Sequence, residues 1–190
     1  MSRFANLLGF VVLCAGSLGA QTSLTVRVHD FTAVPAEVLA NAAAEITYIF
    51  SASSIHIEWL NCSSKARPDH CDENAGPNEI ILRVLPQSGA SAAFGADVLG
   101  RAIGDQYCDI YGSEVIRTAG EKNVQRYQIF AIVIAHELGH LLLGRGAHTP
   151  FGIMRPKWDA ADFDAAAQRR LRFTPEQANL LRAGVQSRNR

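Results

Sequence analysis

Three things are missing from the sequence, and each absence narrows what the chain can be. It carries no net charge, because 18 basic residues balance 18 acidic ones, so no overall field favours nucleic acid or an anionic membrane. It contains no internal repeat, and 190 residues are too few for two comfortable domains. Its N-terminal apolar run, residues 4–13, is shorter than the roughly 20 residues of a permanent membrane anchor. We therefore expect one globular domain without a nucleic-acid partner.

The first twenty residues have the order of a secretory signal peptide. Arg3 gives a positive start, the apolar run follows, and small residues fill positions 14–20 before the polar Gln21. We predict a signal peptide over residues 1–20 and a single domain over 21–190, secreted or periplasmic and without a membrane anchor. The alternative is an N-terminal helix that belongs to the core.

Cysteine use agrees with an exported chain. Removal of the signal peptide would remove Cys14 and leave Cys62, Cys71 and Cys108 in a compartment that permits disulfides. Cys62 and Cys71 flank a polar segment and could close it as a small loop. Cys108 would then be a free thiol, unless it pairs with one of the other two.

The first half of the chain predicts strands and one helix. Apolar and polar residues alternate over 24–31 and 55–60, as in strands, and apolar residues recur at helical spacing between Pro35 and Ile49. A strand, a helix and a strand in this order predict a right-handed crossover between parallel neighbours. We further expect a loop, a third strand and an edge strand, over 61–78, 79–85 and 102–110 respectively.

The second half predicts a buried helix. We expect it to begin at Glu121, and its body over 129–143 is apolar on nearly every side. Gly144 and Gly146 are natural stop signals for this helix. A last helix is expected to follow Thr174, whose hydroxyl can cap it.

The few polar residues in the buried helix form a metal-binding pattern. His136 and His140, four residues apart, lie on one face of a helix, so both imidazoles can bind one ion, with Glu137 beside them. Zinc suits imidazole ligands and makes water acidic, and Glu137 can act as the base that takes the proton. Burying three ionisable groups in an apolar helix is expensive unless something binds them.

A catalytic zinc site needs a third protein ligand. His148 comes just after the glycines that end the helix, where the chain can turn back toward the metal, and it is our candidate. The alternative is an acid on a later helix, such as Glu176. The remaining histidines are expected to face solvent, and three aspartates near the C-terminus are expected on a solvated face rather than in a calcium site. These residues are His29, His56 and His70, and Asp159, Asp162 and Asp164.

These motifs together resemble the metzincin clan of zinc peptidases. The resemblance rests on the segment His136-Glu137-x-x-His140, on His148 and on the segment Gly152-Ile153-Met154. It implies an α+β fold with a twisted, mostly parallel sheet, an antiparallel edge strand, an active-site helix and a small C-terminal subdomain. It also implies a methionine-containing turn beneath the metal, with Met154 as packing rather than as a ligand.

The sequence departs from the metzincin pattern in two places. Gly144 and His148 both follow His140 at a longer spacing than is usual in the clan, which predicts a slightly longer helix and a wider loop. In addition, no tyrosine follows Met154, so a tyrosine that assists the reaction in some metzincins is not expected here.

The sequence therefore predicts a secreted zinc endopeptidase with its catalytic domain over 21–190. Its zinc would be held by His136, His140 and His148, its base would be Glu137, and its substrates would be proteins or peptides. We expect a monomer that binds no nucleic acid. The alternatives are a zincin with a glutamate as third ligand and a secreted module that binds zinc without turnover.

Overall fold

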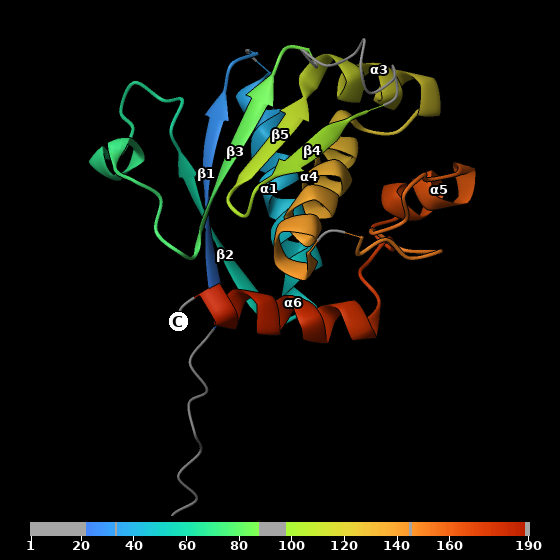
Figure 1. Ribbon diagram of the computed structural model, residues 1–190. Helices are drawn as coiled ribbons and strands as arrows, with labels where there is room; N and C mark the ends of the chain where they lie inside the picture. The colour runs from blue at the N-terminus through green and yellow to red at the C-terminus, as the bar shows by residue number, and fades with distance from the viewer. Residues whose placement is uncertain (1–21, 33, 88–97, 145, 189–190) are drawn as a thin grey trace, which may run out of the picture.

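The computed structural model describes residues 22–32, 34–87, 98–144 and 146–188, so the predicted signal peptide lies outside the described residues. Within these ranges five strands form one sheet (Figure 1). The strands are β1 (Thr22–Asp30), β2 (Ile55–Asn61), β3 (Glu79–Leu85), β4 (Gly100–Ile103) and β5 (Tyr107–Tyr111).

Helices follow or separate the strands. Those described are α1 (Ala36–Ser51), α3 (Gly112–Lys122), α4 (Arg126–Leu143), α5 (Ala160–Ala167) and α6 (Pro175–Arg188), with a 3₁₀ turn at Asp69–Asp72. In the described part of the chain, no helix is both long and apolar enough to cross a membrane.

The sheet is parallel except at one edge. Its strand order is β2-β1-β3-β5-β4, and β1, β2, β3 and β5 run parallel to one another. The short strand β4 pairs antiparallel with β5 and forms the edge of the sheet. The predicted fold class is confirmed in this arrangement, and so is the predicted parallel crossover through α1.

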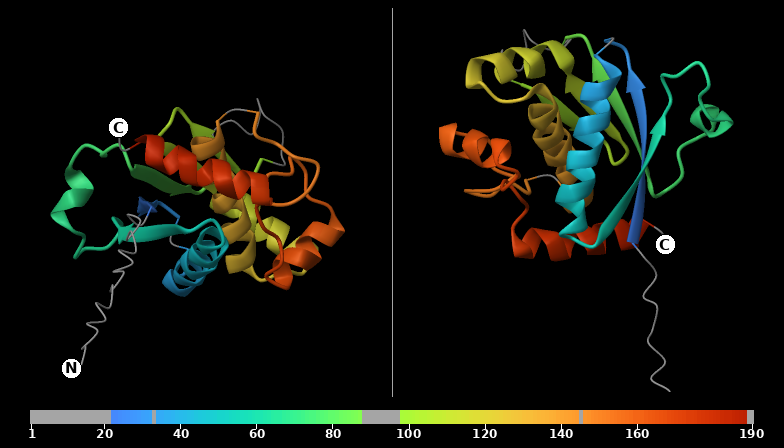
Figure 2. Two further views of the ribbon diagram at one scale, coloured as in Figure 1. Left: turned by 90° about the horizontal axis from the view of Figure 1, so that it is seen from below. Right: turned by 180° about the vertical axis from the view of Figure 1, so that it is seen from behind.

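One face of the sheet carries the core. Alternation along β1 places Leu24 and Val26 inward, where both are fully buried, and the neighbouring strands β3 and β5 add further apolar residues to the same face. Helices α1 and α4 pack side by side against this face, and the view from behind in Figure 2 shows them together. Helix α6 lies across the end of the sheet where β1 begins (Figure 1).

The opposite face of the sheet is polar, but it is not simply exposed. Arg27 on β1 is only 1% exposed and forms an ion pair with Glu79 on β3. The loop between β2 and β3 folds over this pair, and its carbonyl at Glu73 accepts a 2.7 Å hydrogen bond from Arg27 Nη1. A disulfide between Cys62 and Cys71 closes this loop, which is one of the pairings that the sequence left open.

Three predictions about local structure are wrong. The edge strand predicted over 102–110 is a hairpin, β4 and β5, because a turn at Gly104 with φ +62° reverses the chain. The helix predicted to begin at Glu121 is two helices, because Asn123 adopts the left-handed conformation that ends α3. The acids predicted on a solvated face include Asp162, which is buried and forms a capping box with Asp159 at the start of α5.

The predicted capping of the last helix is confirmed. The Thr174 hydroxyl accepts a 3.2 Å hydrogen bond from the backbone N–H of Gln177, and the Gln177 side chain accepts one of 3.0 Å from the Thr174 N–H. This reciprocal pair fixes where α6 begins.

Candidate metal centre

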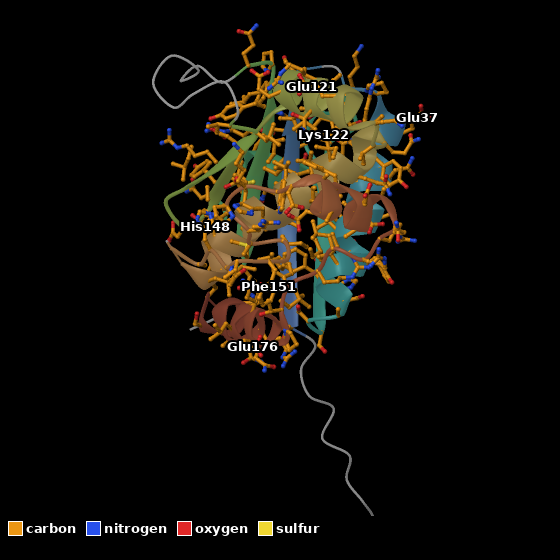
Figure 3. The ribbon with its side chains drawn as sticks, turned by 90° about the vertical axis from the view of Figure 1, so that its right-hand side faces the viewer. Glu37, Glu121, Lys122, His148, Phe151 and Glu176 are labelled. Carbon is orange, nitrogen blue, oxygen red and sulfur yellow. A yellow bond between two sulfur atoms is a disulfide. The ribbon has the colours of Figure 1, made fainter. Side chains whose placement is uncertain are left out.

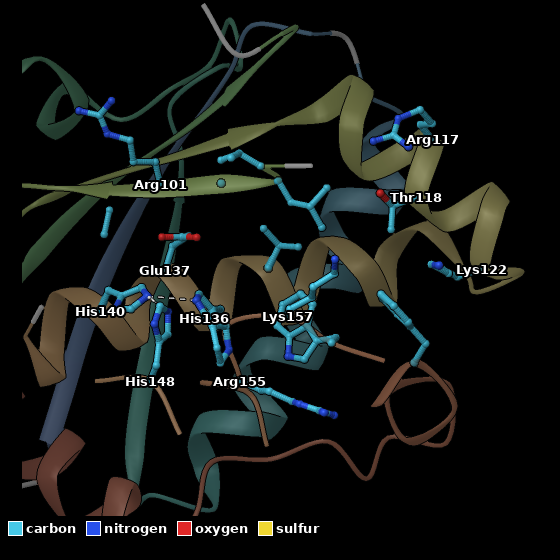
Figure 4. A pocket seen from close by; sticks show the side chains of 18 of the residues that line it. Arg101, Arg117, Thr118, Lys122, His136, Glu137, His140, His148, Arg155 and Lys157 are labelled. Carbon is cyan, nitrogen blue, oxygen red and sulfur yellow. Dashed lines mark hydrogen bonds between the residues drawn. The ribbon is translucent and has the colours of Figure 1, made fainter. Parts of the chain in front are cut away.

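Helix α4 and the turn after it bring three histidines together. His136 and His140 lie one helical turn apart on the side of α4 that faces away from the core. The helix ends before Gly144, whose φ of +89° is a backbone conformation that glycine adopts without strain. His148, further along the chain, lies close to His136 and His140. Figure 4 shows the three rings converging.

The converging atoms are all Nε2 nitrogens. His140 Nε2 lies 3.0 Å from His136 Nε2 and 3.1 Å from His148 Nε2. Three nitrogens bound to one tetrahedral zinc ion at its usual bond length would be about 3.3 Å apart. The donor set and its spacing therefore fit a zinc ion with only a small outward movement of the rings.

A hydrogen bond to the backbone fixes the orientation of the His136 ring. Its Nδ1–H donates a 2.8 Å hydrogen bond to the backbone carbonyl of Ile153, which leaves Nε2 as the nitrogen with a free lone pair. Burial lowers the pKa of His136 to about 4, although the hydrogen bond to Ile153 acts in the opposite direction. The imidazole is therefore neutral near pH 7, which is the state that binds a metal.

Met154 lies directly beneath the helix that carries the histidines. A Cβ at Gly139 would lie 2.4 Å from Met154 Sδ, so α4 and the methionine approach closely only because position 139 has no side chain. The backbone of Met154 accepts a 3.0 Å hydrogen bond from the N–H of Thr149. Met154 is fully buried and serves as packing, as the resemblance implied.

We expect Gly139→Ala to destabilise the protein and weaken its metal site. The added methyl group would displace Met154, at a cost of about 1–3 kcal/mol for an overpacked core. Urea unfolding of the metal-free protein and the zinc dissociation constant would measure the two effects. Gly120→Ala is the matched control, because this helical glycine has open space around it and its substitution should be neutral or slightly stabilising. Equal stability of the Gly139→Ala variant and the wild type would contradict the close approach.

Glu137 lies between α4 and the edge strand. Glu137 is only 8% exposed, and a Cβ added at Gly100 on β4 would lie 3.0 Å from Glu137 Cγ. Burial raises the pKa of Glu137 to about 7, while the backbone N–H of Ala102 favours the charged carboxylate and acts in the opposite direction. A carboxyl group with a pKa near neutrality is suited to taking and returning a proton.

The metal-binding face opens into a pocket of about 680 Å³. One wall is β4 with the two residues before it, another is α4, and a third is the segment after Met154. The pocket extends from the histidines past α4 toward α3 and α5, as Figure 4 shows from close by. Its size matches that of an ordinary small-molecule or peptide-side-chain site.

The other predicted candidates do not join this group. Among the described residues, the cluster with metal-ligand spacing contains the three histidines and no acid. Glu176 lies in the first turn of α6, well below His148 in the view of Figure 3. His56 and His70 are exposed as predicted, although His70 Nε2 also lies 2.5 Å from Glu79 Oε1, whereas His29 is only partly exposed.

Sequence reasoning missed the residues that support the site from outside the motif. Gly100 and Ala102 position Glu137, Gly139 admits Met154, and Trp158 lies edge-on to the His136 ring at 5.5 Å between ring centres. Only Gly139 carried a usable signal, because a glycine inside a buried helix costs stability and calls for a packing reason.

The fold and this site together define an α+β domain whose three histidines can hold a metal ion. Among solved structures, the chain is similar to an archaemetzincin from Methanopyrus kandleri, with a TM-score of 0.53 and 13% sequence identity. The match covers 89% of this chain and 99% of the archaemetzincin chain, so the likeness extends over the whole fold. No known protein family matches the sequence, and no curated protein does.

Proposed function

We propose that the chain is a secreted zinc-dependent endopeptidase that cleaves proteins or peptides and acts as a monomer. The observation that carries the proposal is the meeting of three Nε2 atoms beside a buried glutamate in the lining of one open pocket. Three protein ligands leave room at zinc for a water molecule or a substrate, as catalytic zinc sites require. The likeness to an archaemetzincin supports the same reading of the fold.

Each residue of the site has a proposed task. His136, His140 and His148 hold the metal, and the carbonyl of Ile153 keeps His136 in the binding tautomer. Zinc supplies Lewis acidity, because it polarises a carbonyl group and lowers the pKa of water to about 7. Glu137 takes a proton from the attacking water and then gives it to the departing amine.

The edge strand β4 is proposed to align the substrate. It lies at the end of the sheet order, so one of its sides is not paired within the described sheet, and it forms a wall of the pocket next to Glu137. An extended peptide can add to such an edge through backbone hydrogen bonds. This placement would bring a peptide carbonyl toward the three histidines.

Export from the cytoplasm remains part of the proposal. The signal-peptide pattern of residues 1–20 supports it, and the disulfide between Cys62 and Cys71 fits an oxidising compartment.

Metal removal tests the proposed activity directly. The mature chain, residues 21–190, should contain one zinc ion per molecule and cleave denatured casein. A chelator should abolish cleavage, and one equivalent of zinc should restore it. Absence of zinc from the purified protein, together with failure to bind added zinc, would contradict the metal site. Stoichiometric zinc without cleavage of any unfolded protein would favour the alternative of a non-catalytic zinc-binding module.

A further inference from the structure

The end of the pocket that lies away from His140 and His148 is here called the side pocket. It is defined by Thr118 and Lys122 on α3, Phe163 on α5, and Lys157 and Trp158 after the methionine turn. In the view of Figure 4, Lys157 lies between His136 and Lys122. The side pocket therefore combines two aromatic side chains with two positive charges.

The two lysines stand out against the composition of the chain. Only three of its 18 basic residues are lysines, and two of these three line the side pocket, while the third, Lys65, lies in the disulfide loop. Lysine carries a compact charge on a flexible stem, which suits it to meeting a mobile charged group. The concentration of a rare residue type at one pocket is the first support for a ligand there.

The balance of charge in the pocket is positive. Arg117 pairs with Glu121 and Arg155 pairs with Asp159 and Asp162, so these arginines are largely offset. In the described ranges, no carboxylate forms an ion pair with Lys122 or Lys157, and both side chains are exposed. Among the described residues of the pocket lining, the acids are Glu121 and the buried Glu137, which lies beside the histidines.

Both lysines are held near the pocket by their surroundings. The Lys122 ammonium lies 5.6 Å from the centre of the Phe163 ring, as in a cation–π contact. Lys157 follows Arg155, whose Nη1 lies 2.6 Å from Asp159 Oδ2 and so fastens this segment to the start of α5. The Lys122 charge therefore lies beside an aromatic side chain of the pocket lining.

We propose that the side pocket binds a carboxylate of the substrate, so that the enzyme prefers peptides with an aspartate or glutamate next to the bond that is cleaved. This inference rests on the proposed peptidase function and adds the class of substrate. The carboxylate can belong to an acidic side chain or to the end of a peptide chain, since both present the same group to the lysines. We commit to the side chain as its source, because the pocket lies beside an edge strand that suits an extended chain passing through.

Quenched fluorescent peptides of one sequence test the proposal. One position next to the scissile bond would carry Glu, Gln or Lys, and each peptide would be made with a free and with an amidated C-terminus. The expected result is a kcat/KM about tenfold higher for Glu than for Gln, lower again for Lys, and reduced selectivity at high salt. The state of the C-terminus should make little difference.

Substitution of Lys122 and Lys157 tests whether these two residues cause the preference for the Glu peptide. The double variant Lys122→Gln/Lys157→Gln should cleave Glu and Gln peptides at nearly equal rates. The matched control is Lys65→Gln, which changes the third lysine and should keep the selectivity. A preference that follows the free C-terminus instead of the Glu side chain would overturn the proposal, because the bound carboxylate would then be the end of the peptide chain.

Two further outcomes would overturn the inference, and both differ from failure of the proposed function. The first is equal cleavage of Glu and Gln peptides by the wild type, and the second is full selectivity in the double variant. Cleavage of the neutral peptide reports the peptidase function by itself. If no peptide is cleaved, fluorescence anisotropy of the labelled Glu and Gln peptides on the Glu137→Gln protein still measures the preference. Equal binding there would overturn the inference as well.

Discussion

Replacing Glu137 by glutamine is expected to lower kcat/KM on denatured casein by about 10²–10⁴-fold while zinc stays bound at one ion per molecule. Glutamine has the shape of glutamate but cannot take a proton from water. It also fills the same space between α4 and β4, where Gly100 allows close approach, so folding should be preserved. The measurements are cleavage rate and zinc content on the same preparation.

A glutamate elsewhere on the surface supplies the control for this substitution. Glu37 is exposed in the first turn of α1 and lies far from His148 in the view of Figure 3, so Glu37→Gln should keep both zinc and activity. A Glu137→Gln protein that keeps its zinc and most of its activity would remove Glu137 from the mechanism. Loss of zinc together with activity would instead mean that Glu137 supports the metal site.

Replacing His148 by alanine should lower zinc affinity more than about 100-fold, whereas Glu176→Ala should leave it unchanged. Loss of groups that merely support a ligand already costs about 10–100-fold, and loss of one ligand out of three should exceed this. The structure brings His148 Nε2 to 3.1 Å from His140 Nε2, while Glu176 lies outside the histidine cluster. Competition with a chromogenic zinc chelator would give both dissociation constants.

His56→Ala is the matched control for His148→Ala, because it removes an exposed histidine from β2 on the far side of the sheet order. Its zinc affinity should equal that of the wild type. Weakened zinc binding in Glu176→Ala, with normal binding in His148→Ala, would reverse the assignment and favour the glutamate-type zincin. If both variants bound zinc normally, the third ligand would have to be sought elsewhere.

The parts of the fold that follow from local pattern could be predicted from the sequence. The strand predicted over 79–85 is β3 (Glu79–Leu85), and the strands predicted near 24–31 and 55–60 differ from β1 and β2 by at most two residues at an end. Apolar and polar residues alternate along these strands because one face of the sheet packs on helices and the other face is polar. The polar residues inside an otherwise apolar helix likewise led directly to His136 and Glu137.

The parts that depend on contacts between distant segments could not be predicted. The alternation of β1 places Arg27 on the polar face of the sheet, where a side chain is expected to be exposed. The disulfide loop nevertheless buries Arg27 against Glu79. Helix α3 has few apolar residues of its own, and its end depends on the backbone conformation of Asn123. The neighbours of Glu137 come from β4, about thirty-five residues earlier in the chain, and no local pattern records that approach.

The disulfide loop and helix α4, which carries His136 and His140, lie on opposite sides of the sheet (Figure 1), and this separation bears on how the protein would mature. Before folding, the thiolates of Cys62 and Cys71 are strong zinc ligands and would compete with the imidazoles for the ion. Oxidation converts both into a bond that no longer binds zinc, without touching the histidines. A chain that is oxidised before zinc is available would thus offer the metal the histidine site and not the cysteine pair as well. Export would then serve metal delivery as well as location.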